Sequence, residues 1–475
     1  MDEITNRPAA AIKGEDHWTT KEGNVKLFLF EKCAGDPKNT TGTVLFVHGS
    51  SMAARPTFDL HVEGRPDSSA MDWFARRGFD CWSVDMEGYG RSTKDRDNNA
   101  PIAQGADDCF AAASYIQKLR GKRPFLVYGI SSGALRAAMF AERHPEMKVC
   151  TSVAEALTLG TGKLAVDGVI YIGEQGDYPT NEKGQTLYPR YQFFKQVVEV
   201  FRSSGRSVPV YTDKHFSWNW AWAKEMYDDS RTMGFPLMGG SSLPITWRIP
   251  QVEMPDDAVV TEGMCVAFGG LDSYDVHALE CLQGMVERRK GGEKGVEWLQ
   301  AYRGEEFWKA HEQGVWSQAL FKAALCRSHT LAQAKENFTD VYPTLEEMKA
   351  LTKDPVAYHF QYKDGLRGTI MLMNGLVEDF NFAASIQGQT KPFSTMMYLS
   401  RGRELATLES YFDPIVHYIE QMMYTHKEPY PPERVLLATG LLCAGIDSLY
   451  QGGQRLQTPQ LAIAYQPAPS TLRRT

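Results

Sequence analysis

The segment Phe125-Leu-Val-Tyr-Gly129-Ile-Ser131-Ser-Gly133-Ala-Leu-Arg-Ala-Ala-Met-Phe-Ala141 is an apolar run that ends in Gly-x-Ser-x-Gly and continues into small residues. This order predicts a strand, a sharp turn with Ser131 at its tip, and a helix. The glycines permit a strained turn and let the helix pack close behind the strand. The Ser131 hydroxyl would then stand near a helix N-terminus, whose free N–H groups favour developing negative charge.

Two upstream segments extend the pattern. Thr43-Val-Leu-Phe-Val-His48-Gly49-Ser50 reads as a buried strand that ends in His-Gly, and Phe79-Asp-Cys-Trp-Ser-Val-Asp85 reads as a second strand. A helix-like segment, residues 69–77, lies between them. Strands that alternate with helices in this way predict a parallel α/β layout.

These three motifs, in this order and spacing, resemble the α/β-hydrolase family over residues 20–147. The resemblance implies that Ser131 is a serine nucleophile. It also implies an oxyanion hole built from the backbone N–H groups of Ser132 and Ser50. His48 sits at the motif position that shapes the loop, so we expect it to be structural.

The rest of a catalytic triad can be read from the next two strands. The strand at residues 166–172 ends in Gly173-Glu174-Gln-Gly-Asp177, and the strand at 208–212 is followed by Asp213-Lys214-His215. Serine, acid and histidine then follow in the α/β-hydrolase order. We expect His215 to take the serine proton, with Asp177, or alternatively Glu174, fixing its tautomer.

Residues 148–460 also resemble the Gfo/Idh/MocA family of nicotinamide-dependent sugar oxidoreductases. The likeness is carried by Val153-Ala-Glu-Ala-Leu with Val166-Asp-Gly-Val-Ile-Tyr-Ile, by Val210-Tyr-Thr-Asp213-Lys214-His215, by Asp272-Ser-Tyr-Asp-Val-His277-Ala-Leu-Glu280, and by the segments 355–365 and 412–423. It implies an alternative site with Lys214, His277 and Glu280, and NAD or NADP as cofactor. That family opens with a strand, a Gly-x-Gly-x-x-Gly turn and a helix, and this chain has no such opening. Gly160-Thr-Gly162 has the glycine spacing, but it follows a helix and precedes a strand. Our main expectation is therefore no cofactor.

Composition narrows the function classes. The chain has 475 residues and a formal net charge of -7, which gives no basic footprint for nucleic acid. No long uncharged apolar run predicts a membrane span, and eight cysteines without C-x-x-C spacing argue against zinc and favour a reducing cytoplasm. Asp272, Asp275, His277 and Glu280 include metal-ligand types, but their spacing does not put them all on one helix face, so we expect no metal site.

The sequence thus predicts an α/β parallel sheet with flanking helices, hydrolase-like or Rossmann-like, followed by an α+β domain with a mainly antiparallel sheet. The predicted parts are 1–147 (hydrolase-like), 148–248 (a continuation of the parallel sheet), 249–462 (the α+β domain) and 463–475 (a tail). We expect a serine hydrolase that acts on an ester-like acyl group of a small molecule. The alternatives are a sugar or polyol oxidoreductase, a non-catalytic binding protein and a fusion remnant without activity. An open second-domain sheet, as in the second family, would favour a homo-oligomer.

Overall fold

The computed structural model describes residues 11–50, 52–63, 68–96, 99–121, 125–144, 150–173, 177–332, 342–399 and 412–468. The chain divides into two compact units, Met1–Cys150 and Thr151–Thr475. The unit boundary lies three residues after the predicted end of the hydrolase-like part. Each unit is described separately below.

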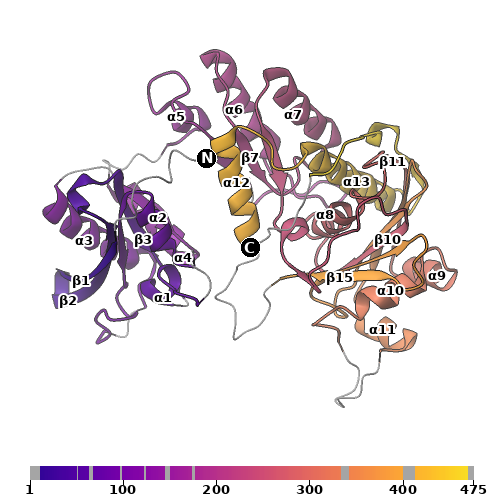
Figure 1. Ribbon diagram of the computed structural model, residues 1–475, viewed down its shortest axis with the longest axis horizontal. Helices are drawn as coiled ribbons and strands as arrows, with labels where there is room; N and C mark the ends of the chain where they lie inside the picture. The colour runs from indigo at the N-terminus through magenta and orange to yellow at the C-terminus, as the bar shows by residue number, and fades with distance from the viewer. Residues whose placement is uncertain are drawn as a thin grey trace. The chain divides into compact units, whose positions relative to one another are not determined.

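The first unit is built on a five-stranded sheet in the order β1-β2-β4-β3-β5. β4, β3 and β5 run parallel, whereas β1 and β2 form an antiparallel hairpin at one side. Helices lie on both sides of the sheet (Figure 1). The elements are β1 (Ile12–Lys21), β2 (Val25–Ala34), β3 (Gly42–Val47), α1 (Ala54–Phe58), α2 (Ala70–Arg76), β4 (Phe79–Val84), α3 (Ile102–Arg120), β5 (Phe125–Gly129) and α4 (Ser132–Arg143).

Alternation along β3 explains why two layers of helices form. Leu45 and Val47 pack into a core with residues of α3 and α4, while Val44 and Phe46 pack into a second core with α1 and α2. Successive strand residues point to opposite faces, so an apolar run of this length is buried on both sides. The predicted strand, turn and helix at 125–141 are confirmed as β5 and α4.

The second unit begins with a three-stranded parallel sheet in the order β6-β7-β8, whose strands alternate with helices. Its elements are α5 (Val153–Thr158), β6 (Val169–Tyr171), α6 (Arg190–Ser204), β7 (Val210–Asp213), α7 (Trp220–Met233) and β8 (Leu237–Gly240). This is the Rossmann-like layout predicted for residues 148–248. That these strands continue the sheet of the first unit stays a prediction.

An eight-stranded sheet follows, in the order β16-β11-β12-β13-β10-β14-β15-β9. Only β10 and β13 pair in parallel among its described strands, which confirms the mainly antiparallel second domain. The strands are β9 (Arg248–Ile249), β10 (Val260–Ala267), β11 (Val296–Arg303), β12 (Val356–Tyr362), β13 (Arg367–Leu372), β14 (Phe380–Ile386), β15 (Phe393–Met397) and β16 (Leu456–Gln457). The helices are α8 (Asp275–Val286), α9 (Glu305–Glu312), α10 (Gln318–Leu325), α11 (Leu345–Leu351), α12 (Asp413–Thr425) and α13 (Pro432–Tyr450).

Helices contact both faces of this sheet, which corrects the expectation of an open sheet. Cys265 and Ala267 of β10 pack in the core formed with α8 and α13. Met264 and Val266, on the opposite face of the same strand, pack with residues of α9, α10 and α11. Figure 1 shows these three helices together at one side of the sheet. Helices therefore cover parts of both faces of this sheet, including the face that we expected to be open for pairing between subunits. The homo-oligomer stays an untested prediction.

The prediction that residues 463–475 form a tail is wrong at Tyr465. Tyr465 is 9% exposed, and its hydroxyl accepts a hydrogen bond from Gln283 at 2.8 Å and donates to Glu287 at 2.8 Å. A buried hydroxyl with two partners belongs to the core. The described part of the chain also holds no helix long and apolar enough to cross a membrane.

Candidate functional site

Ser131 lies at the turn between β5 and α4 with a strained backbone. Its φ and ψ are 53° and -131°, and its side chain is exposed. A positive φ is uncommon for a residue with a side chain and costs about 1–3 kcal/mol, so it persists only where the surroundings impose it. Residues of this kind gather at functional sites. The predicted position of Ser131 at the tip of the turn is thus what the structure has.

The two glycines of the motif make this turn sterically feasible. A Cβ on Gly129 would come within 2.5 Å of the Gly133 carbonyl oxygen. A Cβ on Gly133 would come within 2.2 Å of the carbonyl oxygen of Val47 and 2.5 Å of that of His48. Backbone atoms fill both places, so neither glycine tolerates a side chain without a shift of β3 or α4.

Gly133→Ala is therefore expected to lower the free energy of unfolding of the first unit by about 1–3 kcal/mol, the usual cost of overpacking. Urea unfolding followed by far-UV circular dichroism measures the change. Gly42→Ala is the matched control for substitution of a glycine, because Gly42 does not have a positive φ and its Cβ would lie 3.5 Å from the nearest atom, Phe79 Cε1, an ordinary contact. Equal stability of Gly133→Ala and wild type would show that the elbow packs more loosely than described.

The loop after β3 passes directly beside Ser131. A Cβ on Gly49 would lie 2.9 Å from Ser131 Cβ and 3.4 Å from Ser131 Oγ, so only glycine lets the two backbones come this close. The backbone N–H groups of Ser50 and Ser132 donate to no other residue in the described part of the chain. Two free N–H groups next to a serine hydroxyl are what an oxyanion hole requires. The oxyanion hole itself stays a prediction.

His48 holds this loop in place. Its Nε2 lies 3.0 Å from the backbone N–H of Met86 and must accept that proton, so Nδ1 carries the ring proton and donates to the Gly49 carbonyl at 2.6 Å. Burial lowers the pKa of His48, with the Gly49 carbonyl acting in the opposite direction. Both ring nitrogens are engaged by backbone groups, one in this loop and one in the segment after β4, in keeping with the predicted structural role.

The histidine and acid predicted for the triad lie in the second unit. His215 is 1% exposed, and its Nε2 lies 3.1 Å from Arg190 Nη1. Arginine only donates, so Nε2 accepts and the proton of the neutral ring sits on Nδ1, which is buried without a hydrogen-bond partner. Burial, followed by Arg190, holds the pKa of His215 well below its usual range. Asp177 is exposed and makes no contact with His215, while Glu174 lies outside the described residues.

The alternative site residues lie at the carboxyl end of β7 and on α8. Lys214 has a φ of 64°, and its Nζ lies 2.8 Å from Asp213 Oδ2. His277 is 8% exposed, and its Nδ1 lies 3.9 Å from Glu280 Oε2, beyond hydrogen-bond distance. The Glu280 carboxylate instead accepts from the backbone N–H and the hydroxyl of Ser241. His277 is among the groups that lower the pKa of His215, so the two rings belong to one buried polar cluster.

Asp272 and Asp275 are further members that the sequence suggested only as metal ligands. Asp272 has a φ of 62° and accepts from the backbone N–H of Thr186 at 2.8 Å, and Asp275 accepts from the Tyr358 hydroxyl at 2.9 Å. Burial, followed by the neighbouring charge of Asp275, raises the pKa of Asp272 to about 7. Burial raises the pKa of Asp275 to about 6. Two adjacent carboxyl groups that titrate near neutrality are typical of sites that handle protons.

These values predict how stability depends on pH. Because the pKa of Asp272 is about 7 in the folded chain and ordinary when unfolded, the folded state binds more protons between about pH 4 and 7. The stability that Asp272 contributes is present at low pH and lost as the pH rises to 7. Asp272→Asn removes this dependence, so the variant should gain on wild type as the pH rises from 4 to 7.

Urea unfolding of wild type and Asp272→Asn at several pH values measures this gain. Asp256→Asn is the matched control, because the Asp256 side chain is 89% exposed. A constant difference between wild type and Asp272→Asn across the range would mean that the Asp272 carboxyl is ionised throughout.

A cavity of about 640 Å³ lies in the second unit beside this cluster. Its lining combines two indole rings, amides and charged groups: Asn181, Glu182, Lys183, Gln185, Trp218, Asn219, Trp220, Ala221, Cys443 and Asp447. Lys183 Nζ and Asp447 Oδ1 are 2.5 Å apart. Gln185 joins the lining to the cluster, because its side-chain amide donates to the Trp218 carbonyl and its neighbour Thr186 holds Asp272. The cavity has the size and polarity of a small-molecule site.

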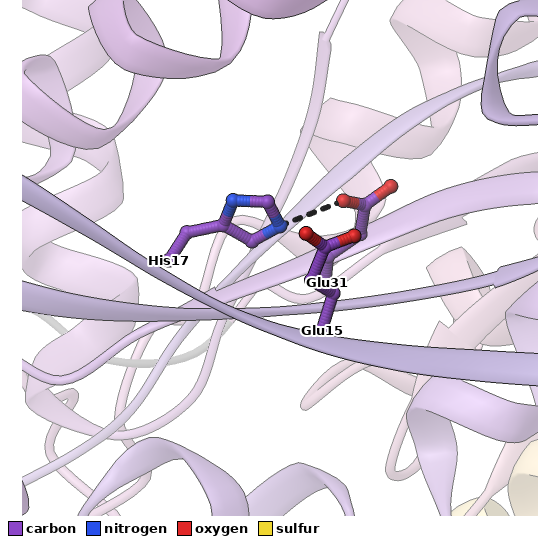
Figure 2. Close-up of side chains that lie close together, drawn as sticks. All are labelled: Glu15, His17 and Glu31. Atoms are coloured by element: carbon purple, nitrogen blue, oxygen red, sulfur yellow. Dashed lines mark hydrogen bonds and ion pairs between the residues drawn. The ribbon is translucent and has the colours of Figure 1, made fainter.

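Two groups in the first unit have metal-ligand chemistry, and both are engaged in ion pairs. Glu15, His17 and Glu31 lie together on the β1–β2 hairpin, where His17 Nε2 is 2.9 Å from Glu31 Oε2 (Figure 2). Arg120 also pairs with the Glu31 carboxylate. The group Asp59, His61 and Asp72 surrounds Lys32, whose Nζ contacts all three side chains. Protein cations pair with the carboxylates of Glu31, Asp59 and Asp72, and we assign no metal to either group.

Residues 39–163 match the family model described as serine aminopeptidase, S33, which confirms the α/β-hydrolase resemblance of this part. No curated protein sequence matches the chain.

Similar solved structures fall into two groups. A probable dehydrogenase from Thermotoga maritima is 14% identical, with 71% of this chain and 92% of that chain covered and a TM-score of 0.41. A myo-inositol dehydrogenase from Corynebacterium glutamicum is 12% identical, with 75% and 96% covered and a TM-score of 0.39. The esterase Pf2001 from Pyrococcus furiosus is 15% identical, with 48% and 82% covered and a TM-score of 0.24.

Proposed function

We propose that this protein is a serine hydrolase that acts on an ester-like or related acyl group of a small molecule through Ser131. The observation that carries the proposal is the exposed serine with a φ of 53° at the junction of β5 and α4, beside the Gly49 loop. The family match over residues 39–163 supports it, since this range includes both the elbow and the loop.

The chemistry assigned to these residues is acyl transfer. Ser131 Oγ forms a bond to the acyl carbon, and the carbonyl electron pair moves to oxygen, where the N–H groups of Ser50 and Ser132 stabilise the negative charge. A base takes the serine proton, which then protonates the departing alcohol. Water attacks the acyl-enzyme in a second, equivalent step and releases the acid.

We do not extend the proposal to His215 as that base. Its Nε2 lone pair is occupied by the Arg190 N–H, and its Nδ1 carries the remaining proton of the neutral ring. A ring with no free lone pair cannot accept a proton from serine. Of the four histidines of the first unit, His48 is engaged on both ring nitrogens by the Gly49 carbonyl and the Met86 N–H.

Treatment of the purified chain with a fluorophosphonate probe tests the proposal. We expect a single adduct, mapped by mass spectrometry to Ser131, because the probe reacts with activated serines and leaves ordinary ones unmodified. Heat-denatured protein is the control for non-specific reaction. Absence of an adduct in well-folded protein would remove the hydrolase assignment.

A second candidate rests on the buried cluster of the second unit. Lys214, Asp272 and His277 lie there together with a neighbouring cavity of about 640 Å³. They favour a sugar or polyol site like that of the Gfo/Idh/MocA oxidoreductases, in which Lys214 and His277 would handle protons.

The residues present do not fit a nicotinamide cofactor. Among the described residues of the second unit, the parallel sheet has only β6, β7 and β8. Gly160 and Gly162 lie between α5 and β6, so they follow a helix rather than connect a strand to a helix N-terminus. The pyrophosphate of a dinucleotide needs the strand-to-helix arrangement. We derive no hydride-transfer step.

Isothermal titration with NAD and, separately, with myo-inositol tests this candidate. Heat of binding for myo-inositol that is lost in Lys214→Met would support a polyol site. Heat of binding for NAD at millimolar concentration would overturn the statement that the cofactor does not fit. No heat with either compound removes the candidate.

A further inference from the structure

Arg136 on α4 is a buried cation without an acidic partner. Its side chain is 1% exposed, and it forms no ion pair with any carboxylate in the described part of the chain. An isolated charge is costly to bury unless neighbouring dipoles stabilise it. The cavity for the guanidinium stem depends on Gly105, where a Cβ would lie 2.3 Å from Arg136 Cδ. The fold therefore makes room for a positive charge one helical turn beyond the nucleophile.

The contacts of Arg136 join the loop beside Ser131 to the segment that precedes α3. Nη1 donates to the His48 carbonyl at 2.9 Å, and Nε and Nη2 donate to the Ala100 carbonyl at 3.0 and 2.8 Å. Nη2 also lies 3.4 Å from Ser50 Oγ. In a trans peptide the N–H points away from the C=O, so fixing the His48 carbonyl also fixes the direction of the Gly49 N–H.

The same contacts involve the hydroxyl groups of Ser50 and Ser132. Arg136 can only donate, so Ser50 Oγ accepts from it and keeps its own proton to donate. Ser50 Oγ lies 2.6 Å from Ser132 Oγ. Either hydroxyl can donate to the other, and in both arrangements one proton of the pair is free for a group beside the elbow. Gly49 contacts Ser131, so the pairs 49–50 and 131–132 lie side by side.

We propose that Arg136 is a positioning residue for the reaction at Ser131: it fixes the His48–Ser50 loop and, by donating to Ser50, leaves one hydroxyl proton of the Ser50–Ser132 pair free to donate beside the nucleophile. Its charge, unmatched by a carboxylate, also favours the negative charge that forms on the acyl oxygen. The inference rests on the proposed hydrolase function and adds a residue outside the Gly-x-Ser-x-Gly motif. The substrate group that Arg136 and the two serines would stabilise is the acyl oxygen, which becomes negative during the reaction.

The rate of fluorophosphonate labelling at Ser131 tests the inference in Arg136→Met and Arg136→Lys. Loss of an oxyanion donor commonly costs roughly 10²–10³-fold, and we expect roughly a 10²-fold slower rate in Arg136→Met. Arg136→Lys keeps the charge and should recover part of the rate. Removing the charge should also move the pH profile of labelling to higher pH, a change that loosened packing does not produce.

Two further variants separate positioning from folding. Arg143→Met removes an exposed arginine of the same helix, which pairs with Asp107, and should leave the labelling rate unchanged. Ser50→Ala removes the hydroxyl that connects Arg136 to Ser132. Arg136→Met should therefore slow labelling less in a Ser50→Ala background than in wild type. Thermal unfolding of each variant identifies any that fail to fold. If Arg136→Met does not fold, the labelling rate and pH profile of the conservative variant Arg136→Lys test the inference.

The outcomes are distinct. Labelled wild type with a slowed Arg136→Met and a shifted pH profile supports the inference. Labelled wild type with an unchanged rate in folded Arg136→Met overturns it and leaves the hydrolase function standing. Unlabelled wild type overturns the hydrolase function and, with it, this inference.

Discussion

Ser131→Ala is expected to abolish covalent labelling and to lower the rate of ester hydrolysis by at least roughly 10³-fold. The alanine keeps the strand, the turn and the helix N-terminus but removes the only atom that bonds to the acyl carbon in the proposed reaction. Binding and the oxyanion N–H groups would remain, so a small residual rate is compatible with the proposal. Steady-state hydrolysis of a p-nitrophenyl acyl ester measures the loss.

The control for Ser131→Ala is Ser203→Ala, which removes an exposed hydroxyl on helix α6 of the second unit. Its rate should equal that of wild type. Full hydrolysis by Ser131→Ala would place the activity elsewhere in the chain. The proposed mechanism would then be abandoned, since no other serine has been assigned to the nucleophile elbow.

Arg434→Met is expected to lower the free energy of unfolding of the second unit by about 3–5 kcal/mol, because it leaves a buried carboxylate without its cation. Arg434 is 1% exposed and Glu287 is fully buried, and Arg434 Nε lies 2.9 Å from Glu287 Oε2. The Tyr465 hydroxyl donates to the same carboxylate oxygen. Urea unfolding followed by tryptophan fluorescence measures the change.

The matched control for this pair is Arg303→Met. Arg303 and Asp354 form an ion pair with both side chains about half exposed, and such pairs contribute about 0–1 kcal/mol. The double variant Arg434→Met, Glu287→Gln should recover part of the lost stability, since it leaves no buried charge. If Arg434→Met were no less stable than Arg303→Met, the interior pair would be reached by solvent.

The sequence predicted the elements of the first unit because their signals are local. An apolar strand, two glycines and a small-residue helix stand next to one another at 125–141, so the backbone conformation at Ser131 follows from neighbouring residues. The loop at Gly49 was found for the same reason. The β12–β13 hairpin also has a local signal, because it turns at Asp364 and Gly365.

Residues that depend on tertiary contacts were less predictable. Nothing near His215 in the sequence indicates that Arg190, 25 residues away, donates to its ring. The carboxyl groups of Asp272 and Asp275 gain their raised pKa values from burial, which no spacing shows. Arg136 reads as an ordinary helix residue until its contacts with His48 and Ala100 are seen. Tyr465 is followed by Gln466 and a segment rich in alanine and proline. This local sequence is typical of an exposed tail, so it did not indicate that Tyr465 is buried.

Ser131, Lys214 and Asp272 share a left-handed backbone although each carries a side chain. Glycine would remove the backbone strain at all three positions. Substitution by glycine would therefore raise the free energy of unfolding, but it would remove the side chains that the candidate sites need. Selection for heat resistance alone would therefore erode these positions early, and laboratory evolution of this protein has to score activity and stability in the same screen.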